Sequence, residues 1–430
     1  MKSSPKEAIL HIYDSAIDAS NASRNVYLHE EKIKKISNSS SISSIYLLAF
    51  GKAAPQMASA AEEILQGKIT EGLVVTKKYH AINYIPRAEH NIHLMEAGHP
   101  LPDSNSVKAS EKALALLDKA NKNTMVLCLI SGGGSALLAS PDGGIKLSEK
   151  KSITKSLLRA GADINDINTV RKHLSSVKGG KLAEAAYPAR ILSLLISDVA
   201  DNRLDVIASG PTAPDPATFK DALDILEKFH IKASPSIRKH IENGIKGDVP
   251  ETLKPGDPVF RKVKHHIIAS NRDAIEAARG MAELFGFRTH VLSHSLTGDV
   301  VDAAKWLSTE IRKHEAPCCC IAGGETTVKV MGKGKGGRNT ELALRLALAT
   351  QDIKGLAALC VGTDGTDGPT DAAGAMVSGA TIPEARKMGL SPEDTLREND
   401  TYHFFKKNGG LLITGPTGTN VMDLTIILLT

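Results

Sequence analysis

The chain has 430 residues, of which 42% are hydrophobic and 23% charged, a composition typical of a folded protein with two or three domains. The formal net charge of +5 is small for this length, and aromatic residues make up only 4%, so the composition argues against nucleic-acid binding and favours small acidic ligands. The N-terminus Met1–Pro5 has no apolar signal segment and no apolar run reaches transmembrane length, so we expect a cytoplasmic protein without membrane contact.

Short apolar runs alternate with helical patterns along the chain. We expect strands at Ile45–Phe50, Gly72–Thr76, Ile92–Glu96, Met125–Ile130, Ile191–Ser197, His265–Ala269, Thr289–Ser293, Cys318–Ala322, Leu356–Val361 and Leu411–Thr414. We expect helices at Asn105–Lys119, Asp166–Ala186, Asn271–Leu284, Val300–Lys313 and Asn339–Ala349. Several strand runs are continuously apolar, as in parallel sheets buried on both faces. The alternation predicts an α/β protein with open, doubly wound, Rossmann-like sheets.

A segment rich in Pro and Gly divides the chain from Gly247 to Pro258. Such a composition is typical of a linker. We therefore expect an N-terminal α/β domain over residues 1–246 and a C-terminal α/β domain over residues 259–430. An interdomain cleft is then the default position of an active site.

The five cysteines lie in strand-like runs, and three of them are consecutive at Cys318–Cys320. Neighbouring side chains on a strand point to opposite faces and cannot form a compact metal site. We therefore expect buried, reduced thiols.

Glycine-rich loops follow two of the expected strands at their carboxyl ends, where α/β sheets bind ligands. Ser131-Gly132-Gly133-Gly134-Ser135 can form a nest of backbone N–H groups for a phosphate, or a plain tight turn. Lys52, at the end of Ile45–Phe50, can bind a phosphoryl group or a carboxylate, or can be an ordinary surface lysine. No Gly-x-x-x-x-Gly-Lys-Ser/Thr sequence occurs, which excludes an ordinary P-loop.

Charged residues mark three further segments. Arg171 and Lys178 lie in one expected helix and would share a face that either binds a ligand or is only solvated. Asp198 closes an apolar strand, where an aspartate can accept a proton from a substrate hydroxyl or hold Mg²⁺. Asp364 belongs to the acidic, glycine-rich segment Gly362–Asp371, a pattern that favours a cation-binding or hydroxyl-binding loop over a simple acidic turn.

The densest group of charges and glycines lies between Gly323 and Asn339. Cations interleaved with glycines indicate an anion with more than one charge. The segment Gly332–Gly337 also matches the dinucleotide pattern Gly-x-Gly-x-x-Gly, but its variable positions are cationic and no clear ribose-binding acid follows. Because no Gly-x-Ser-x-Gly elbow occurs, phosphoryl transfer is favoured over a serine hydrolase.

A set of short blocks extends over nearly the whole chain. These blocks are Gly51–Ala54, Glu96–Pro100, Ser131–Ala136, Val170–Ser175, Ser197–Val199, Ser209–Thr212, Gly323–Thr327, Gly337–Glu341, Gly362–Gly368 and Gly418–Asp423. Together they resemble the glycerate 2-kinase family, and the second half is similar to its MOFRL domain. The resemblance implies phosphorylation of D-glycerate at the 2-hydroxyl by ATP, with Mg²⁺ or another divalent cation, giving 2-phosphoglycerate and ADP.

The resemblance also implies catalytic residues. The positions that match residues of the family's interdomain cleft are Lys52, Asp198, Glu325, Arg338, Asp364 and Asn420. Asp198 would be the base for the 2-hydroxyl, while Lys52 and Arg338 would neutralise charge on the transferring phosphoryl group.

Binding roles follow from the same resemblance. The expected nucleotide-binding and phosphate-binding residues are Ser131, Gly132, Gly133, Gly134, Ser135, Glu325, Lys333 and Asn420. Arg171 and Lys178 would bind the glycerate carboxylate, and Asp364 and Glu325 would hold the metal ion or orient the nucleotide.

The main alternative is an NAD(P)H-dependent hydroxypyruvate reductase that uses the loop Gly332–Gly337 for its cofactor. A non-catalytic anion-binding protein is a third hypothesis, against which the many acidic residues at strand ends argue. The sequence leaves the oligomeric state open, and a homodimer is compatible with it.

Overall fold

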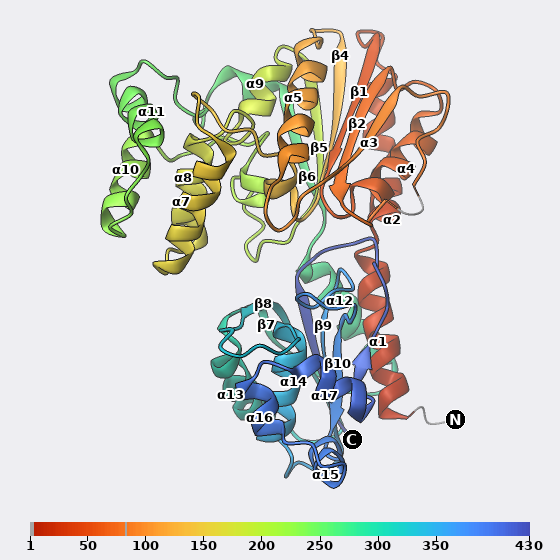
Figure 1. Ribbon diagram of the computed structural model, residues 1–430. Coiled ribbons are helices and arrows are strands. Elements are labelled where there is room, and N and C mark those ends of the chain that lie inside the picture. Colours follow the sequence, from red (N-terminus) through yellow and green to blue (C-terminus); the bar gives the residue numbers. More distant parts are fainter. Residues whose placement is uncertain (1–3, 82–83) are drawn as a thin grey trace. The chain divides into compact units, whose positions relative to one another are not determined.

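The computed structural model describes residues 4–81 and 84–430 and forms two compact units (Figure 1). The parallel-sheet unit contains residues 22–197 and 202–268. The mixed-sheet unit contains the described residues up to Asn21, residues 198–201 and residues 269–430. Met1–Ser3, part of the segment in which no signal sequence is expected, lie outside the described residues.

The parallel-sheet unit has a six-stranded sheet in the order β3-β2-β1-β4-β5-β6. Its strands are β1 (Ser44–Phe50), β2 (Glu71–Lys77), β3 (Ile92–Ala97), β4 (Thr124–Ile130), β5 (Arg190–Ile196) and β6 (Val263–Ala269). β1 pairs in parallel with both β2 and β4. β2 also pairs in parallel with β3, and β4 with β5. Every residue of β4 is buried, as its continuous apolar sequence predicts.

Helices cover this sheet and form a second core beside it. They are α2 (Ala22–Tyr27), α3 (Glu30–Ser37), α4 (Ala54–Leu65), α5 (Ser104–Asp118), α6 (Gly134–Leu137), α7 (Leu147–Arg159), α8 (Ile164–His173), α9 (Lys181–Ala186), α10 (Phe219–Lys228) and α11 (Pro235–Lys246). Short 3₁₀ turns lie at η1 (Ile207–Ser209) and η2 (Pro258–Lys262). Ile153, Val170, Phe219 and Ile241 join α7, α8, α10 and α11 in one apolar cluster, and Figure 1 shows these helices gathered beside the sheet.

The mixed-sheet unit has its strands in the order β11-β10-β9-β12-β8-β7. They are β7 (Arg288–Asp299), β8 (Cys318–Thr327), β9 (Leu356–Gly362), β10 (Gly374–Ser378), β11 (Leu411–Leu412) and β12 (Asp423–Leu429). β7 and β8 are parallel, whereas β12 is antiparallel to both β8 and β9. The expectation of a parallel sheet is therefore wrong for this unit, because β12 enters its centre in the opposite direction.

The helices of the mixed-sheet unit include one from the start of the chain. They are α1 (Pro5–Ala19), α12 (Asn271–Leu284), α13 (Val300–Ile311), α14 (Arg338–Ala349), α15 (Thr381–Lys387), α16 (Pro392–Arg397) and α17 (Thr401–Asn408). Ser4 forms a capping box at the start of α1. The Ser15 hydroxyl donates to Ala277 O in α12 at 3.3 Å, and Thr419 Oγ1 donates to Ser20 O at 2.6 Å. The predicted domain range 1–246 therefore needs correction at its N-terminal end.

The segment 247–258 is not a linker. Leu253 N donates to Gly179 O at 3.2 Å, and Asp215 N donates to Leu253 O at 2.8 Å. Thr252 and Leu253 are buried. The Pro and Gly residues of this segment therefore shape a packed loop of the parallel-sheet unit, and the boundary between the units follows Ile268.

The helix expected over Asp166–Ala186 is interrupted. α8 ends at His173 and α9 begins at Lys181, with Gly179 and Gly180 between them at φ values of 60° and 84°. Only glycine adopts this left-handed conformation readily. Arg171 and Lys178 therefore do not share a helix face.

All five cysteines are free and buried, as expected. Burial raises the pKa of Cys128 to about 12, which keeps its thiol protonated. Among the described residues, no helix has the length and apolarity needed to cross a membrane.

Candidate active site

The loops after β1 and β4 are joined to each other in the parallel-sheet unit. The two strands are neighbours, with Phe50 opposite Ile130 at their ends. Lys52 N donates to Gly132 O at 2.9 Å, and Ala53 N donates to the Ser131 hydroxyl at 3.0 Å. Ser131 is fully buried, so its hydroxyl holds the two loops together and does not face a ligand, contrary to the phosphate-binding role expected for it.

The centre of the glycine loop is formed by Gly132, which is buried, and Gly133, which is half-buried. No partner for the backbone N–H of Gly132 or Gly133 is found within the described residues. A Cβ atom at Gly133 would lie 2.9 Å from the His99 ring and 3.4 Å from Lys52 Cγ. The absence of a side chain at Gly133 thus lets Lys52 and His99 pack against it. His99 lies in the block Glu96–Pro100, but the sequence gives it no predicted role.

The next residue of the loop, Gly134, is a packing residue. Its N–H donates to Ser131 O at 3.4 Å. A Cβ atom there would lie 2.9 Å from the Phe50 ring and 3.0 Å from Ala208 Cβ. Gly134 therefore permits close packing, while the N–H groups before it are the candidates for phosphate binding.

Two basic side chains converge on the main chain of Ser135. Lys178 Nζ donates to Ser135 O at 2.9 Å and to Leu138 O at 3.1 Å, and Arg171 Nη2 donates to Ser135 O at 3.4 Å. Burial lowers the pKa of Lys178 well below its ordinary value, and repulsion from Arg171 and Lys150 adds to the effect. Burial also lowers the pKa of Arg171, to about 10.

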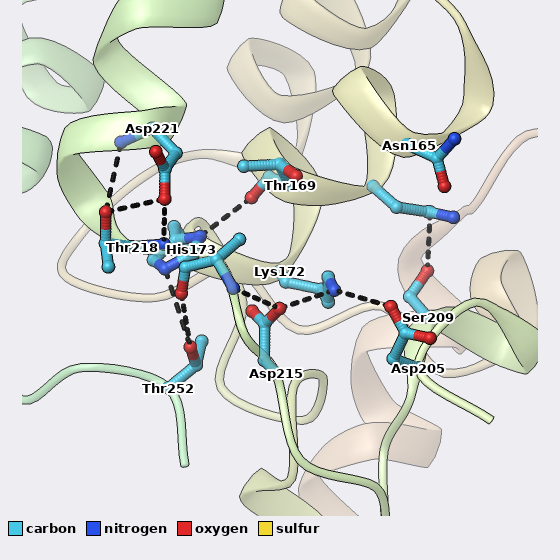
Figure 2. Close-up of polar contacts among 12 residues, drawn as sticks. Asn165, Thr169, Lys172, His173, Asp205, Ser209, Asp215, Thr218, Asp221 and Thr252 are labelled. Carbon is cyan, nitrogen blue, oxygen red and sulfur yellow. Dashed lines mark hydrogen bonds and ion pairs between the residues drawn. The ribbon is translucent and has the colours of Figure 1, made fainter. Parts of the chain in front are cut away.

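α8 is anchored by a buried polar network. Figure 2 shows Lys172 between Asp215, at 2.6 Å, and Asp205, at 3.8 Å. His173 Nδ1 lies 2.8 Å from Thr169 O, and its Nε2 lies 3.1 Å from a Glu251 carboxylate oxygen. Fixed in this way, α8 holds Arg171 at the end of the glycine loop.

Acidic residues gather where the strands β8, β12 and β9 of the mixed-sheet unit have neighbouring ends. Asp423 starts the central strand β12 and lies opposite Gly324 of β8 and Gly362 of β9. Glu325 follows on β8, and Asp364 lies two residues beyond β9. Because adjacent strands are about 4.8 Å apart, the β8 and β9 ends lie roughly 10 Å from each other across Asp423.

Arg338, the first residue of α14, is held by two of these acids. Its Nε and Nη2 lie 2.5 Å and 2.8 Å from the two Asp423 carboxylate oxygens, and Nη1 lies 2.8 Å from Glu325 Oε1. Burial opposes the charge of Arg338, but Asp423 and Glu325 outweigh it and raise the arginine pKa. Asp423 ends the block Gly418–Asp423, but nothing in its local sequence predicts this contact with Arg338.

The N-terminus of α14 already has an anion from the protein itself. The buried Asp367 carboxylate accepts from Asn339 N and Thr340 N at 2.9 Å each and from the Thr340 hydroxyl at 2.8 Å. Burial raises the pKa of Asp367, against the effect of these donors. This helix end, which the dinucleotide hypothesis needs for a pyrophosphate, is therefore occupied.

The loop Gly332–Gly337 packs against residues 398–401. Met331 N and Gly332 N donate to Asn399 Oδ1 at 2.8 Å and 2.9 Å, and Gly334 N donates to Glu398 O at 2.8 Å. A Cβ atom at Gly334 would lie 2.4 Å from Asp400 Cβ. These glycines allow close packing and do not form an open phosphate cradle, which corrects the interpretation of this segment.

The remaining expected residues, Asp364, Asn420, Lys333 and Asp198, differ in burial and in position along the chain. Asp364 is buried, and its Oδ1 accepts from Thr366 N and the Thr366 hydroxyl at 3.0 Å each. Asn420 is buried in the loop before β12, and Lys333 is exposed. Asp198 follows β5, and residues 198–201 group with the mixed-sheet unit.

Known proteins resemble this chain over most of its length. Two family models match it: a domain of unknown function, DUF4147, over residues 8–242, and the MOFRL family over residues 318–423. A D-glycerate 2-kinase of Thermotoga maritima is 45% identical over 389 residues, which cover 89% of this chain and 90% of that protein. A crystal structure of glycerate kinase from Thermotoga maritima has a TM-score of 0.84 at 42% identity and covers 99% of each chain. An Agrobacterium vitis protein named "Putative hydroxypyruvate reductase" is 39% identical over 388 residues, which cover 88% of this chain and 86% of that protein.

Proposed function

The chain belongs to the glycerate 2-kinase family, and from that premise we propose that it transfers the γ-phosphoryl group of ATP to the 2-hydroxyl of D-glycerate. The products are 2-phosphoglycerate and ADP. The observation that best supports this activity is the loop Ser131–Ser135, in which the Gly132 and Gly133 N–H groups have no partner among the described residues and the Lys52 stem packs against Gly133. Backbone N–H groups of a glycine-rich loop, with a lysine in the neighbouring loop, are suited to a phosphate.

In the proposed reaction the 2-hydroxyl oxygen of glycerate attacks the γ-phosphorus, and the bond from that phosphorus to the leaving oxygen of ADP breaks. Asp198 accepts the hydroxyl proton. Lys52 and Arg338 neutralise charge on the transferring group, which supplies much of the catalysis in phosphoryl transfer.

The contacts of Arg338 divide its guanidinium into a fixed side and an exchangeable side. Asp423 is buried and binds Nε and Nη2, whereas Glu325, whose side chain is 47% exposed, binds Nη1. We expect a phosphate oxygen to replace Glu325 on Nη1 while Asp423 keeps the guanidinium in place. Lys333 and Asn420 complete the proposed nucleotide contacts, and Arg171 is the proposed partner of the glycerate carboxylate.

The acidic residues also suit a divalent cation. Glu325 and Asp364 offer carboxylate oxygens, the ligands that Mg²⁺ prefers. Within the described part of the chain, no cluster of three His, Cys, Asp or Glu side chains forms a complete metal site. A Mg²⁺ ion here would be held by one or two carboxylates together with substrate phosphates and water, and it would supply positive charge beside those phosphates.

Incubation with D-glycerate, ATP and Mg²⁺, with enolase added to consume the product, tests the proposal. Enolase accepts 2-phosphoglycerate but not 3-phosphoglycerate, so its signal reports both the activity and the position of phosphorylation. Lys52→Ala and Arg338→Ala should each lower kcat by about 10²–10³-fold. Release of ADP without an enolase signal would place the phosphate on another hydroxyl, and no ADP at all would refute the kinase proposal.

The reductase alternative is disfavoured by the mixed-sheet unit. The loop it requires donates its N–H groups to Asn399 and Glu398, and Asp367 occupies the following helix end. Oxidation of NAD(P)H with hydroxypyruvate would revive that alternative.

A further inference from the structure

A buried chain of hydroxyl groups ends at Ser135. The Ser209 hydroxyl donates to Asn168 Oδ1 at 3.0 Å, and Ser135 Oγ lies 2.7 Å from Ser209 Oγ. A serine hydroxyl has a single proton to donate. With the Asn168 amide oxygen turned toward Ser209, Ser209 gives its proton to Asn168 and Ser135 is the donor to Ser209. This hydroxyl relay, formed by Ser135, Ser209 and Asn168, therefore leaves lone pairs and no proton on Ser135 Oγ for any further partner.

The backbone that places Ser209 is strained. Ala208 and Ser209 have φ values of 51° and 64°, and Gly210 follows at 60°. Two successive non-glycine residues in the left-handed region are rare, and such strain is found mainly at functional sites. Gly179 N donates to Ser209 O at 3.2 Å and Gly180 N donates to Gly210 O at 2.8 Å, which holds this conformation in place.

The carbonyl of Ser135 also faces inward, because Lys178 and Arg171 donate to it. Ser135 itself is only partly buried. The polar feature that it can offer to a ligand through its side chain is thus an acceptor oxygen, next to the Arg171 guanidinium.

Phosphate oxygens of ATP are acceptors and cannot bind an acceptor. A hydroxy acid, in contrast, provides both a carboxylate for Arg171 and a hydroxyl proton for Ser135. In glycerate the 2-hydroxyl gives its proton to the catalytic base, which leaves the 3-hydroxyl as the donor.

We propose that Ser135 Oγ accepts a hydrogen bond from the 3-hydroxyl of glycerate, so that Ser135 selects substrates with a second hydroxyl and is not a phosphate ligand. This inference rests on the proposed glycerate kinase activity. It assigns Lys178 a positioning role, because the lysine makes the shorter hydrogen bond to the Ser135 carbonyl, whereas Arg171 donates to it through Nη2 alone.

The first test compares D-glycerate with D-lactate, which lacks the 3-hydroxyl, in the wild type and in Ser135→Ala. The measured quantities are kcat/KM for D-glycerate, the inhibition constant of D-lactate against it, and KM for ATP. Ser135→Ala should lower kcat/KM for D-glycerate about tenfold, the usual effect of one neutral hydrogen bond. The D-lactate inhibition constant and KM for ATP should stay unchanged. Equal losses for both acids, or an effect on KM for ATP alone, would overturn the proposal.

The second test reverses the polarity of the hydroxyl relay with a matched pair of variants. Asn168→Asp keeps an acceptor for Ser209, whereas Asn168→Leu removes it and frees Ser135 to present its own proton. KM for D-glycerate should rise in Asn168→Leu and stay near the wild-type value in Asn168→Asp, with KM for ATP unchanged in both. Equal KM values for D-glycerate in the two variants would contradict the relay, and thermal melting of each variant checks folding.

The two proposals fail in different ways. A wild-type protein that releases no ADP with D-glycerate refutes the kinase activity itself. An active wild type whose Ser135→Ala variant shows no selective loss refutes only the role of Ser135.

Discussion

Replacement of Asp423 by Asn should weaken the ion pair that holds Arg338 at the start of the central strand β12. The asparagine keeps one acceptor oxygen but places an NH₂ group against an arginine N–H, so one charge-assisted hydrogen bond becomes a contact between two donors. Breaking a buried ion pair costs about 3–5 kcal/mol. Because Arg338 keeps Glu325 at 2.8 Å and its side chain is 27% exposed, we expect the free energy of unfolding to fall by about 2–3 kcal/mol.

The assay is urea unfolding followed by tryptophan fluorescence. Trp306 is the only tryptophan and lies in α13, so its signal reports on the mixed-sheet unit. Glu325→Gln is the matched control, and because the Glu325 side chain is 47% exposed its loss should cost less than about 1 kcal/mol. We also expect kcat of Asp423→Asn to fall by about 10²-fold, since Arg338 is the residue proposed to neutralise charge on the phosphoryl group and this change would displace it. A variant as stable as Glu325→Gln, with normal kcat, would refute the argument.

Two further predictions concern packing and pH. In the mixed-sheet unit, Gly334→Ala should destabilise the fold because its Cβ would lie 2.4 Å from Asp400 Cβ. Gly280→Ala, with open space around it in α12, should instead raise the free energy of unfolding by about 0.5–1 kcal/mol. Urea unfolding of both variants checks this, and a change of the same sign in both would contradict it. In the parallel-sheet unit, burial raises the pKa of Glu251, but hydrogen bonds from His173 and other donors outweigh it and lower the pKa to about 2. The carboxylate therefore stabilises the fold above its ordinary pKa of 4.5 and loses this effect as the pH falls toward 2, so Glu251→Gln should lower Tm clearly at pH 7 and less at pH 3. A Tm difference that is constant with pH would show that the charge is not involved.

Elements with a strong local pattern could be predicted from the sequence. β1 and β4 were placed to within one residue because continuous apolar runs between glycine-rich loops leave few alternatives. β12 is absent from the predicted strands although Leu424–Leu429 is apolar apart from Thr425, and its central, antiparallel place in the sheet depends on pairing with distant strands. The sequence predicts one helix that carries both Arg171 and Lys178. In the structure α8 ends at His173, so only Arg171 lies on a helix, yet both side chains donate to Ser135 O.

The candidate site could be predicted in its residue types but not in its contacts. Lys52 and Arg338 stand out as cations in glycine-rich segments, whereas the buried side of Arg338 depends on Asp423, far along the chain. The glycines near residue 334 have the same local pattern as a phosphate loop, and only the packing of residues 398–401 shows their structural role. The polarity of Ser135 likewise depends on hydrogen bonds to residues from two other segments.

The origin of β12 and α1 at opposite ends of the chain constrains the order of folding during synthesis. The residues of the parallel-sheet unit emerge between them, so that unit can fold first. α1, whose Ile9, Ile12 and Ala16 are buried in the finished protein, must wait for α12 with this apolar face uncovered. The mixed sheet stays split between β8 and β9 until β12 joins them, and such late, long-range pairing slows folding and favours aggregation. The unit that carries Arg338 can therefore complete its sheet only after β12 has been synthesised.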